Sequence, residues 1–237
     1  MAAAKKNEII EIKPVQMETV SLTIVGDTPL IVHKWSEKAR RELLKGTGIG
    51  KKVPRNMYAE AAATLWWMDI AHDPFSMAYK GGNITTFDDW IEKYKGYGQE
   101  DYLRDVSGAR FGFPVTAIKK AAISAAYRNE MSKDKVSLQG CFFIPGEGED
   151  QLAEIICDGV PSIREDSVKV GMGTADLRYR AQFENWRMNI LLHYNVNGRL
   201  SLSDIINIIN LGGQTNGIGE WRIEKSGQFG MFHVKAD

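Results

Sequence analysis

The sequence predicts an α+β fold in which helices cover one face of a small sheet. Three patterns lead to this prediction. Residues 18–25 alternate polar and β-branched apolar side chains, which indicates a strand. Residues 114–128 carry an alanine-rich apolar stripe, which indicates a helix packed closely on a sheet. Residues 186–235 read as a strand, a helix and a second strand, which is the order of a crossover unit.

The start of the chain predicts an arm, a strand and a short helix. Residues 1–16 are polar and predict an N-terminal arm outside the fold. The turn sequence at residues 26–29 ends the first strand, and Ser36 is a suitable N-cap for a helix over residues 37–44. The outer face of this helix is basic. The simpler explanation of these basic side chains is that they are solvated, and the alternative is that they contact phosphate.

Residues 46–110 predict a largely helical insertion in a single domain that spans residues 17–237. Residues 57–70 have the pattern of a helix. Residues 72–110 are polar, aromatic and only weakly periodic, so they do not continue the pattern of the sheet.

A basic glycine-rich loop at residues 45–55 has the look of a phosphate-binding P-loop. That motif needs a glycine five residues before Gly50 and a serine or threonine after Lys51. Those positions hold Lys45 and Lys52, so we reject the P-loop. Lys51 and Lys52 remain candidate contacts for a polyanion.

The remaining elements complete a predicted ferredoxin-like core. Strands near residues 19–25, 136–144, 187–195 and 231–235 should form one sheet, with a further short strand at 154–158. Helices at 114–128 and 202–211 should cover one face of that sheet. A capping box at residues 201–204 begins the second helix, and the pair Gly212-Gly213 should end it.

Residues 164–187 predict an extended ribbon with a glycine-rich bend. Arg178 and Arg180 should lie on one face, because side chains two residues apart in a strand point the same way. With the ring of Tyr179, they supply the cations and aromatic surface that a groove for a single nucleic-acid strand needs. An antiparallel pair of strands with a charged outer face explains the same pattern equally well.

The stretch from residue 212 to residue 230 contains six of the 23 glycines in the chain. Such a cluster indicates positive φ angles or close approach of the main chain to another group. Trp221, Arg222 and Lys225 lie among these glycines and suit stacking on a base and pairing with a phosphate. The alternative is a tight hairpin after a helix, with Trp221 in the core.

Composition limits the classes of function. The 237 residues have a formal net charge of zero, so any nucleic-acid site must be a local basic patch. Cys141 and Cys157 fit no metal-ligand spacing and indicate a reducing compartment. We predict no metal and no cofactor. The absence of a signal-peptide pattern and of a long apolar run predicts a cytoplasmic protein without a membrane partner.

The C-terminal glycine motif resembles that of a known superfamily. Gly217-Ile218-Gly219, then basic residues and Gly227-Gln228-Phe229-Gly230 before a last strand, resemble the glycine-rich loop of the RAMP superfamily. These are CRISPR-associated RNA-binding proteins built on ferredoxin-like folds, and the resemblance covers about the last fifty residues. It implies contact with RNA backbone for Gly217, Gly219, Arg222, Lys225, Gly227 and Gly230. It also implies that residues 169–180 correspond to a hairpin that presses on nucleic acid. The insertion at 46–110 departs from the family's pattern.

Three further segments resemble an uncharacterised family of bacteriophage proteins over most of residues 19–235. They are residues 28–33 (Thr-Pro-Leu-Ile-Val-His), 170–180 (Val-Gly-Met-Gly-Thr-Ala-Asp-Leu-Arg-Tyr-Arg) and 217–222 (Gly-Ile-Gly-Glu-Trp-Arg). This resemblance implies a phage-encoded chain that works in the host cytoplasm.

Three functions are compatible with these patterns. The first is a non-catalytic protein that binds single-stranded RNA or DNA and forms a homo-oligomer along the strand. The second is a metal-independent endoribonuclease of the RAMP type, for which His33 beside Lys34 is the one candidate general base. A lone histidine in an apolar segment more often has a structural role. The third is a phage assembly or anti-defence protein that binds another protein or a small nucleotide.

Overall fold

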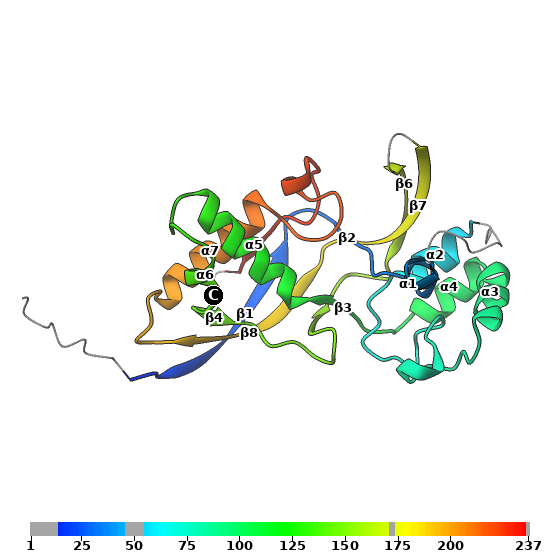
Figure 1. Cartoon of the computed structure of the whole chain (residues 1–237), viewed down its shortest axis with the longest axis horizontal. Coiled ribbons are helices and arrows are strands. Elements are labelled where there is room, and N and C mark those ends of the chain that lie inside the picture. The colour runs from blue at the N-terminus through cyan, green and yellow to red at the C-terminus, as the bar shows by residue number, and fades with distance from the viewer. Residues whose placement is uncertain (1–13, 46–54, 171–173, 236–237) are drawn as a thin grey trace, which may run out of the picture.

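The computed structural model of the protein describes residues 14–45, 55–170 and 174–235. Within these residues the chain combines helices with antiparallel sheets (Figure 1), so the predicted α+β class is confirmed. Lys51 and Lys52, most of the predicted arm and the glycine-rich bend of the predicted ribbon lie outside the described residues.

A four-stranded antiparallel sheet lies at one end of the molecule. Its order is β4 (Phe142–Phe143), β8 (Arg187–Asn195), β1 (Met17–Gly26) and β9 (Phe232–Val234). The side chains of β8 alternate between exposed and buried, so Met188, Ile190 and Leu192 enter the core. All four predicted strand regions contribute to this one sheet.

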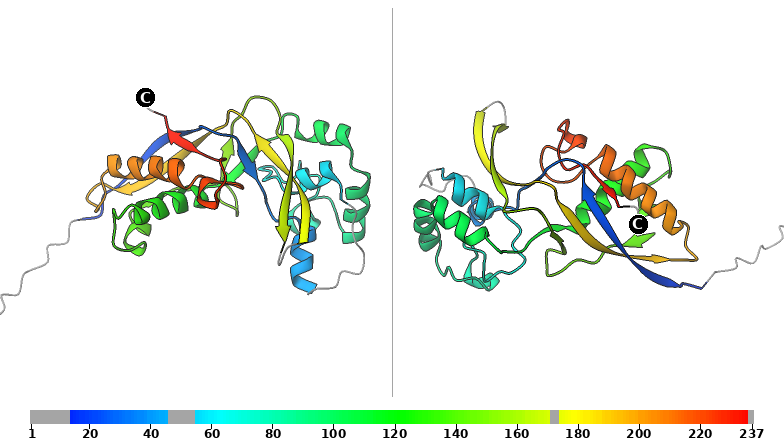
Figure 2. Two further views of the ribbon diagram at one scale, coloured as in Figure 1. Left: turned by 90° about the horizontal axis from the view of Figure 1, so that it is seen from above. Right: turned by 180° about the vertical axis from the view of Figure 1, so that it is seen from behind.

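Two helices, α5 (Val115–Arg128) and α7 (Leu202–Thr215), lie side by side on one face of the sheet (Figure 2). A Cβ atom on Gly212 would lie 2.6 Å from the main-chain nitrogen of Ala122, so the small residues allow this close packing. Gly213 faces the carbonyl of Phe232 even more closely. The prediction that these glycines end the helix is therefore wrong, because α7 continues through them to Thr215.

The predicted strand at residues 136–144 is also largely wrong. Residues Val136–Gln139 form a short helix, α6, and only the two residues of β4 pair with the sheet. The carboxylate of Asp134 accepts a hydrogen bond from the main-chain nitrogen of Ser137 at 2.7 Å. This local bond favours a helical turn over extended chain.

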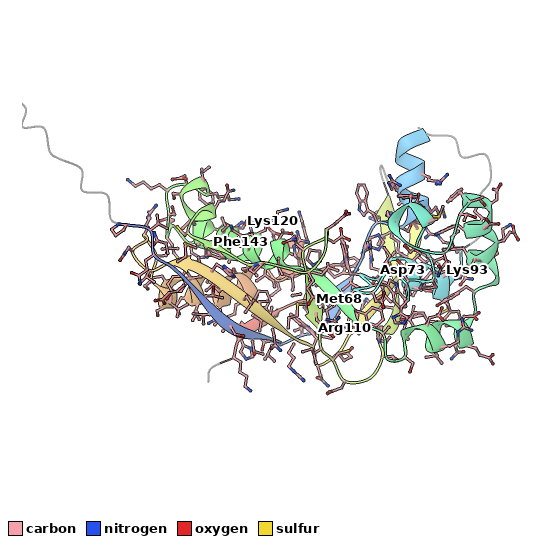
Figure 3. The ribbon with its side chains drawn as sticks, turned by 90° about the horizontal axis from the view of Figure 1, so that it is seen from below. Met68, Asp73, Lys93, Arg110, Lys120 and Phe143 are labelled. Carbon is pink, nitrogen blue, oxygen red and sulfur yellow. The ribbon has the colours of Figure 1, made fainter. Side chains whose placement is uncertain are left out.

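The predicted helix at residues 57–70 is shorter than expected. Helix α2 spans Met57–Ala63, and the chain then runs beside strand β3 (Phe111–Pro114). The main-chain nitrogen of Gly112 donates to the carbonyl of Trp66 at 2.8 Å, and that of Met68 donates to the carbonyl of Arg110 at 3.0 Å. Met68 and Arg110 lie close together in Figure 3. Pairing with β3 therefore replaces the last turns of the helix.

The rest of the chain forms two further sheets and a helical region. β3 pairs with β5 (Leu152–Ile155), and a second sheet has the order β2 (Leu30–Val32), β7 (Thr174–Phe183) and β6 (Ser162–Val170). β6 and β7 form the predicted ribbon, a hairpin that projects from the body in Figure 1. Helices α1 (Glu37–Lys45), α2, α3 (Phe87–Gly96) and α4 (Gln99–Val106) lie at the other end of the molecule. Two short 3₁₀ turns, η1 (Ala78–Lys80) and η2 (Ile223–Lys225), complete the fold.

The helical region has an aromatic core of its own. Trp90 is fully buried, and its ring lies 5.5 Å from that of Phe75 and 5.0 Å from that of Tyr94, measured between centroids. Helices α2, α3 and α4 all fall within the predicted insertion at residues 46–110. None of the helices in the described part of the chain has the length and apolarity that a membrane span requires.

Candidate nucleic-acid interface

The glycine loop, defined here as residues 216–230, packs against the base of the β6–β7 hairpin. The guanidinium carbon of Arg164 in β6 lies 4.6 Å from the centroid of the Phe229 ring. Nη2 of Arg180 in β7 lies 3.5 Å from Oε2 of Glu220 in the loop. Two regions that the sequence marked separately therefore meet in one surface.

Arg180 holds this junction together. It is buried, and its Nη1 donates to Oδ2 of Asp166 at 2.9 Å across the hairpin. Nε of Arg164 donates to the other carboxylate oxygen of Asp166 at 2.7 Å. Burial alone would raise the pKa of Asp166, but these hydrogen bonds hold it below its ordinary value. The charge of Arg180 is therefore compensated inside the protein, and its contact with nucleic acid stays a prediction.

The other two hairpin candidates are closer to solvent. Nε of Arg178 lies 3.7 Å from Oδ2 of Asp176, and its side chain is about one-third exposed. The main-chain nitrogen of Tyr179 donates to Oε1 of Glu60 at 3.3 Å, which ties β7 to α2. Contact of Arg178 and Tyr179 with nucleic acid stays a prediction.

The glycines of the loop approach the protein's own main chain. Gly217, Gly219 and Gly230 have φ angles of 66°, 81° and 69°. A Cβ atom on Gly219 would lie 2.5 Å from the carbonyl oxygen of Ile31, and one on Gly227 would overlap the carbonyl of Trp221. The internal packing of the loop therefore requires these glycines. Direct contact of the glycines with nucleic acid stays a prediction.

The polar candidates in the loop have different surroundings. Trp221 is 38% exposed, so the alternative that places it in the core is wrong. Nε of Arg222 donates to Oε2 of Glu224 at 3.0 Å, and its Nη1 donates to the carbonyl of Gly219 at 3.2 Å. Lys225 is exposed at the end of η2. Arg222 thus stabilises the loop, whereas Trp221 and Lys225 face solvent.

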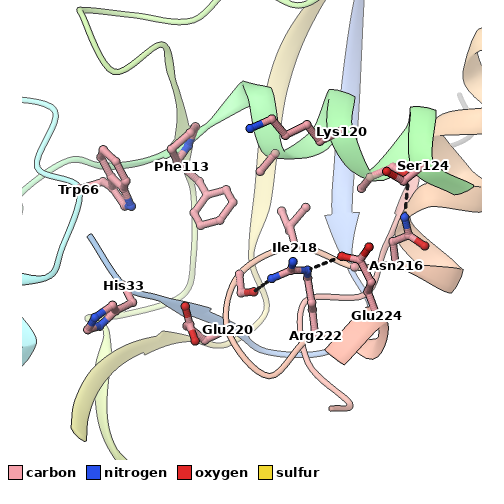
Figure 4. A pocket seen from close by; sticks show the side chains of 15 residues that line it. His33, Trp66, Phe113, Lys120, Ser124, Asn216, Ile218, Glu220, Arg222 and Glu224 are labelled. Atoms are coloured by element: carbon pink, nitrogen blue, oxygen red, sulfur yellow. Dashed lines mark hydrogen bonds and ion pairs between the residues drawn. The ribbon is translucent and has the colours of Figure 1, made fainter. Parts of the chain in front are cut away.

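A cleft of about 420 Å³ lies between the glycine loop, α5 and the chain that carries His33 and Trp66. Figure 4 shows Arg222 and Glu224 on one side of it and His33 and Trp66 across from them. Phe113 and Ile218 supply apolar walls, and Lys120 of α5 lies at the rim.

His33 lines this cleft and carries an unpaired, buried ring nitrogen. Its Nδ1 is buried and has no hydrogen-bond partner among the described residues. Burial, followed by the charges of Arg180 and Arg178, lowers the pKa of His33 to about 4. The imidazole is therefore neutral at neutral pH.

Sequence reasoning missed Trp66 and Lys120 as parts of this cleft. Trp66 is half-buried, and Nζ of Lys34 lies 5.1 Å from the centroid of its ring. Lys120 is exposed on the side of α5 that faces the loop. The pair of adjacent tryptophans at 66 and 67 was the one available signal, because only one of two neighbours in an irregular segment can enter the core.

Among the described residues, no group of three or more histidine, cysteine, aspartate or glutamate side chains is arranged to hold a metal ion. The free cysteines Cys141 and Cys157 are partly buried, and burial raises the pKa of each thiol. Neither thiol is part of the cleft.

Comparison with known proteins adds little to this description. No model of a known protein family matches the sequence. No curated protein matches it either. The crystal structure of Cmr6 from Pyrococcus furiosus is similar, with a TM-score of 0.31 and 11% sequence identity over 94% of this chain and 100% of that chain. A TM-score this low does not establish a shared fold.

Proposed function

We propose that this protein binds single-stranded nucleic acid without cleaving it, and that the cleft beside the glycine loop is the centre of the binding surface. The observation that carries the proposal is the meeting of the loop with the hairpin. Beside this junction, the loop, α5 and the chain at His33 and Trp66 enclose a cleft that is lined by the ring of Trp66, the exposed Lys120 and the side chain of His33.

The chemistry of the cleft suits one nucleotide of a strand. Its volume of about 420 Å³ is in the range of pockets that hold small ligands. The ring of Trp66 offers a face for stacking on a base. Lys120 offers charge for phosphate at the rim of the cleft, whereas Nζ of Lys34 lies over the Trp66 ring and 3.6 Å from Oδ2 of Asp150.

The properties of His33 argue against the endoribonuclease alternative. A general base works best when its pKa is near the working pH, and the pKa of His33 is about 4. Its Nδ1 has no carboxylate partner among the described residues that would orient the ring. We therefore propose no catalytic role for His33.

The proposed fold family, origin and self-association of the protein rest on different observations. We infer that the core is ferredoxin-like, because the order β4–β8–β1–β9 with α5 and α7 on one face is that of a split β-α-β unit. The RAMP-type assignment, phage origin and self-association along a strand rest on the sequence resemblance alone. The single domain at residues 17–237 with an insertion stays a prediction. A protein that binds another protein or a small nucleotide is the alternative that a negative binding result would favour.

Two measurements test the proposed function. The purified protein should carry nuclease-sensitive material that raises its ultraviolet absorbance ratio. Fluorescence anisotropy should then detect binding of labelled single strands, weaker binding of duplex of the same sequence, and an affinity that falls with salt. Absence of binding to both RNA and DNA strands at low salt would exclude the proposal.

A further inference from the structure

A second basic surface surrounds the start of α1, a few residues after His33, which lines the cleft. Glu37 is buried, and four groups converge on its carboxylate. Nε of Arg41 lies 3.2 Å from Oε1, Nη1 of Arg40 lies 3.4 Å from Oε1, and Nζ of Lys80 lies 3.9 Å from Oε2. The hydroxyl of Tyr79 donates to Oε2 at 2.6 Å. One carboxylate thus holds three cations in place, and positive charge remains in excess.

Aromatic rings fix the two guanidinium groups. The guanidinium carbon of Arg40 lies 4.9 Å from the centroid of the Tyr79 ring, and that of Arg41 lies 4.6 Å from the centroid of the Phe87 ring. Stacking of this kind holds the guanidinium plane, and the N–H groups that do not bond Glu37 or Tyr79 can bind an anion. The side chains of Arg40 and Lys80 are 46% and 40% exposed, so solvent reaches both.

An exposed tryptophan lies next to these cations. Trp35 is 66% exposed, and Tyr79 is 55% exposed. Large rings at the surface beside cations are the components of a platform that stacks bases while it binds phosphates. From the sequence alone, solvated charge was the simpler explanation of the basic face of α1. In the folded protein, aromatic rings lie beside these basic side chains.

This platform is continuous with the cleft. His33 and Trp66 line the cleft, and Nζ of Lys34 lies over the Trp66 ring. Lys34 also lines a small hollow together with Trp35, Glu37 and Lys80. Five consecutive residues, 33–37, therefore connect the two surfaces. Asp73 is a second carboxylate on this hollow, and burial raises its pKa to about 6.

We propose that the α1 platform, defined as Trp35, Arg40, Arg41, Tyr79 and Lys80, binds phosphates and one base of the same single strand that occupies the cleft. This inference rests on the proposed function and extends its footprint. The cations of the platform suit a polyanion, and its exposed rings suit stacking on bases. A flexible single strand of nucleic acid offers both phosphates and exposed bases.

Strand length separates this proposal from the proposed function. A labelled strand of about 6 nucleotides fills the cleft alone, whereas one of about 20 nucleotides reaches both surfaces. The Arg40→Gln, Arg41→Gln double variant should weaken binding of the long strand about tenfold and lower its log–log salt slope by about 1.4. It should leave binding of the short strand within about twofold of wild type. Arg187→Gln, on the strand face away from the helices, is a control that removes one positive charge outside the platform.

A second variant covers the risk that loss of both arginines leaves Glu37 unpaired and unfolds α1. Trp35→Ala removes the exposed ring and leaves the ion cluster intact. This variant should also weaken binding of the long strand and leave binding of the short strand unchanged. Equal affinity of wild type and Trp35→Ala for the long strand would overturn the platform while leaving the cleft in place. Failure of wild-type protein to bind either strand would overturn both proposals. Trp66→Ala should weaken binding of both the short and the long strand, because both strands occupy the cleft. This result distinguishes the cleft from the platform.

Discussion

The α-carbon of Gly219 lies so close to the carbonyl oxygen of Ile31 that a Cβ atom would be 2.5 Å from that oxygen. The φ angle of Gly219 is 81°, which other residues rarely adopt. The next residue, Glu220, donates its main-chain N–H to the same carbonyl at 2.9 Å. This contact fixes the glycine loop to β2 and so sets the width of the cleft.

Gly219→Val should therefore destabilise the fold. The strained φ angle and the clash with Ile31 together should cost about 2–4 kcal/mol, seen as a lower Tm in thermal unfolding. Gly159→Ala is the control, because Gly159 has a φ of 77° but nothing within 4 Å of its Cβ position. That variant should lose only about 1 kcal/mol. An unchanged Tm for Gly219→Val would mean that the loop is not fixed to β2 as described.

Trp221→Ala should affect binding more than stability. The ring is 38% exposed, so its loss leaves no closed cavity, and the Tm should change little. If the ring stacks on a base, affinity for a single strand should fall by about 1–3 kcal/mol. Trp186→Ala is the contrasting variant, because Trp186 is 1% exposed and its loss should cost about 3–5 kcal/mol of stability. A large drop in Tm for Trp221→Ala with unchanged affinity would contradict this assignment.

His33 should make stability depend on pH. Its pKa is lowered from 6.5 to about 4 in the folded protein, so between these values the unfolded chain binds more protons than the folded one. The stabilisation is complete above pH 6.5 and is lost as the pH falls toward 4, with a total of about 3 kcal/mol. Denaturant unfolding of His33→Gln across this range should lack that loss. His33→Ala should also leave any nucleic-acid activity intact. Loss of RNA cleavage in a folded His33→Ala protein would instead support the endoribonuclease.

Local patterns predicted much of the fold and part of the site. Alternation located β1 and β8, and the capping box located the start of α7, because these signals depend on neighbouring residues. The pair Gly212-Gly213 was misread because its packing partner, Ala122, lies ninety residues away in the sequence. Strand β4 has only two residues for a local reason: the carboxylate of Asp134 accepts a hydrogen bond from the main chain of Ser137, which favours the helical turn of α6.

The site shows the same division between local and tertiary information. The glycine loop and the hairpin stand out by composition, but their contact through Arg164 and Phe229 is tertiary. Arg180 has the sequence pattern of a phosphate contact, and only the fold reveals that Asp166 compensates its charge. Trp66 and Lys120 enter the cleft from elements that no short pattern connects.

The most direct test of the central claim is the salt dependence of single-strand binding by the Lys120→Gln, Lys225→Gln double variant. Both lysines are exposed, whereas Arg222 holds the carbonyl of Gly219 and is a poor probe. If the cleft and loop grip phosphates, the variant should bind a strand more weakly. Its log–log salt slope should fall by about 1.4, with an unchanged Tm. An unchanged affinity and slope in the folded variant would contradict the account and favour a protein-binding function.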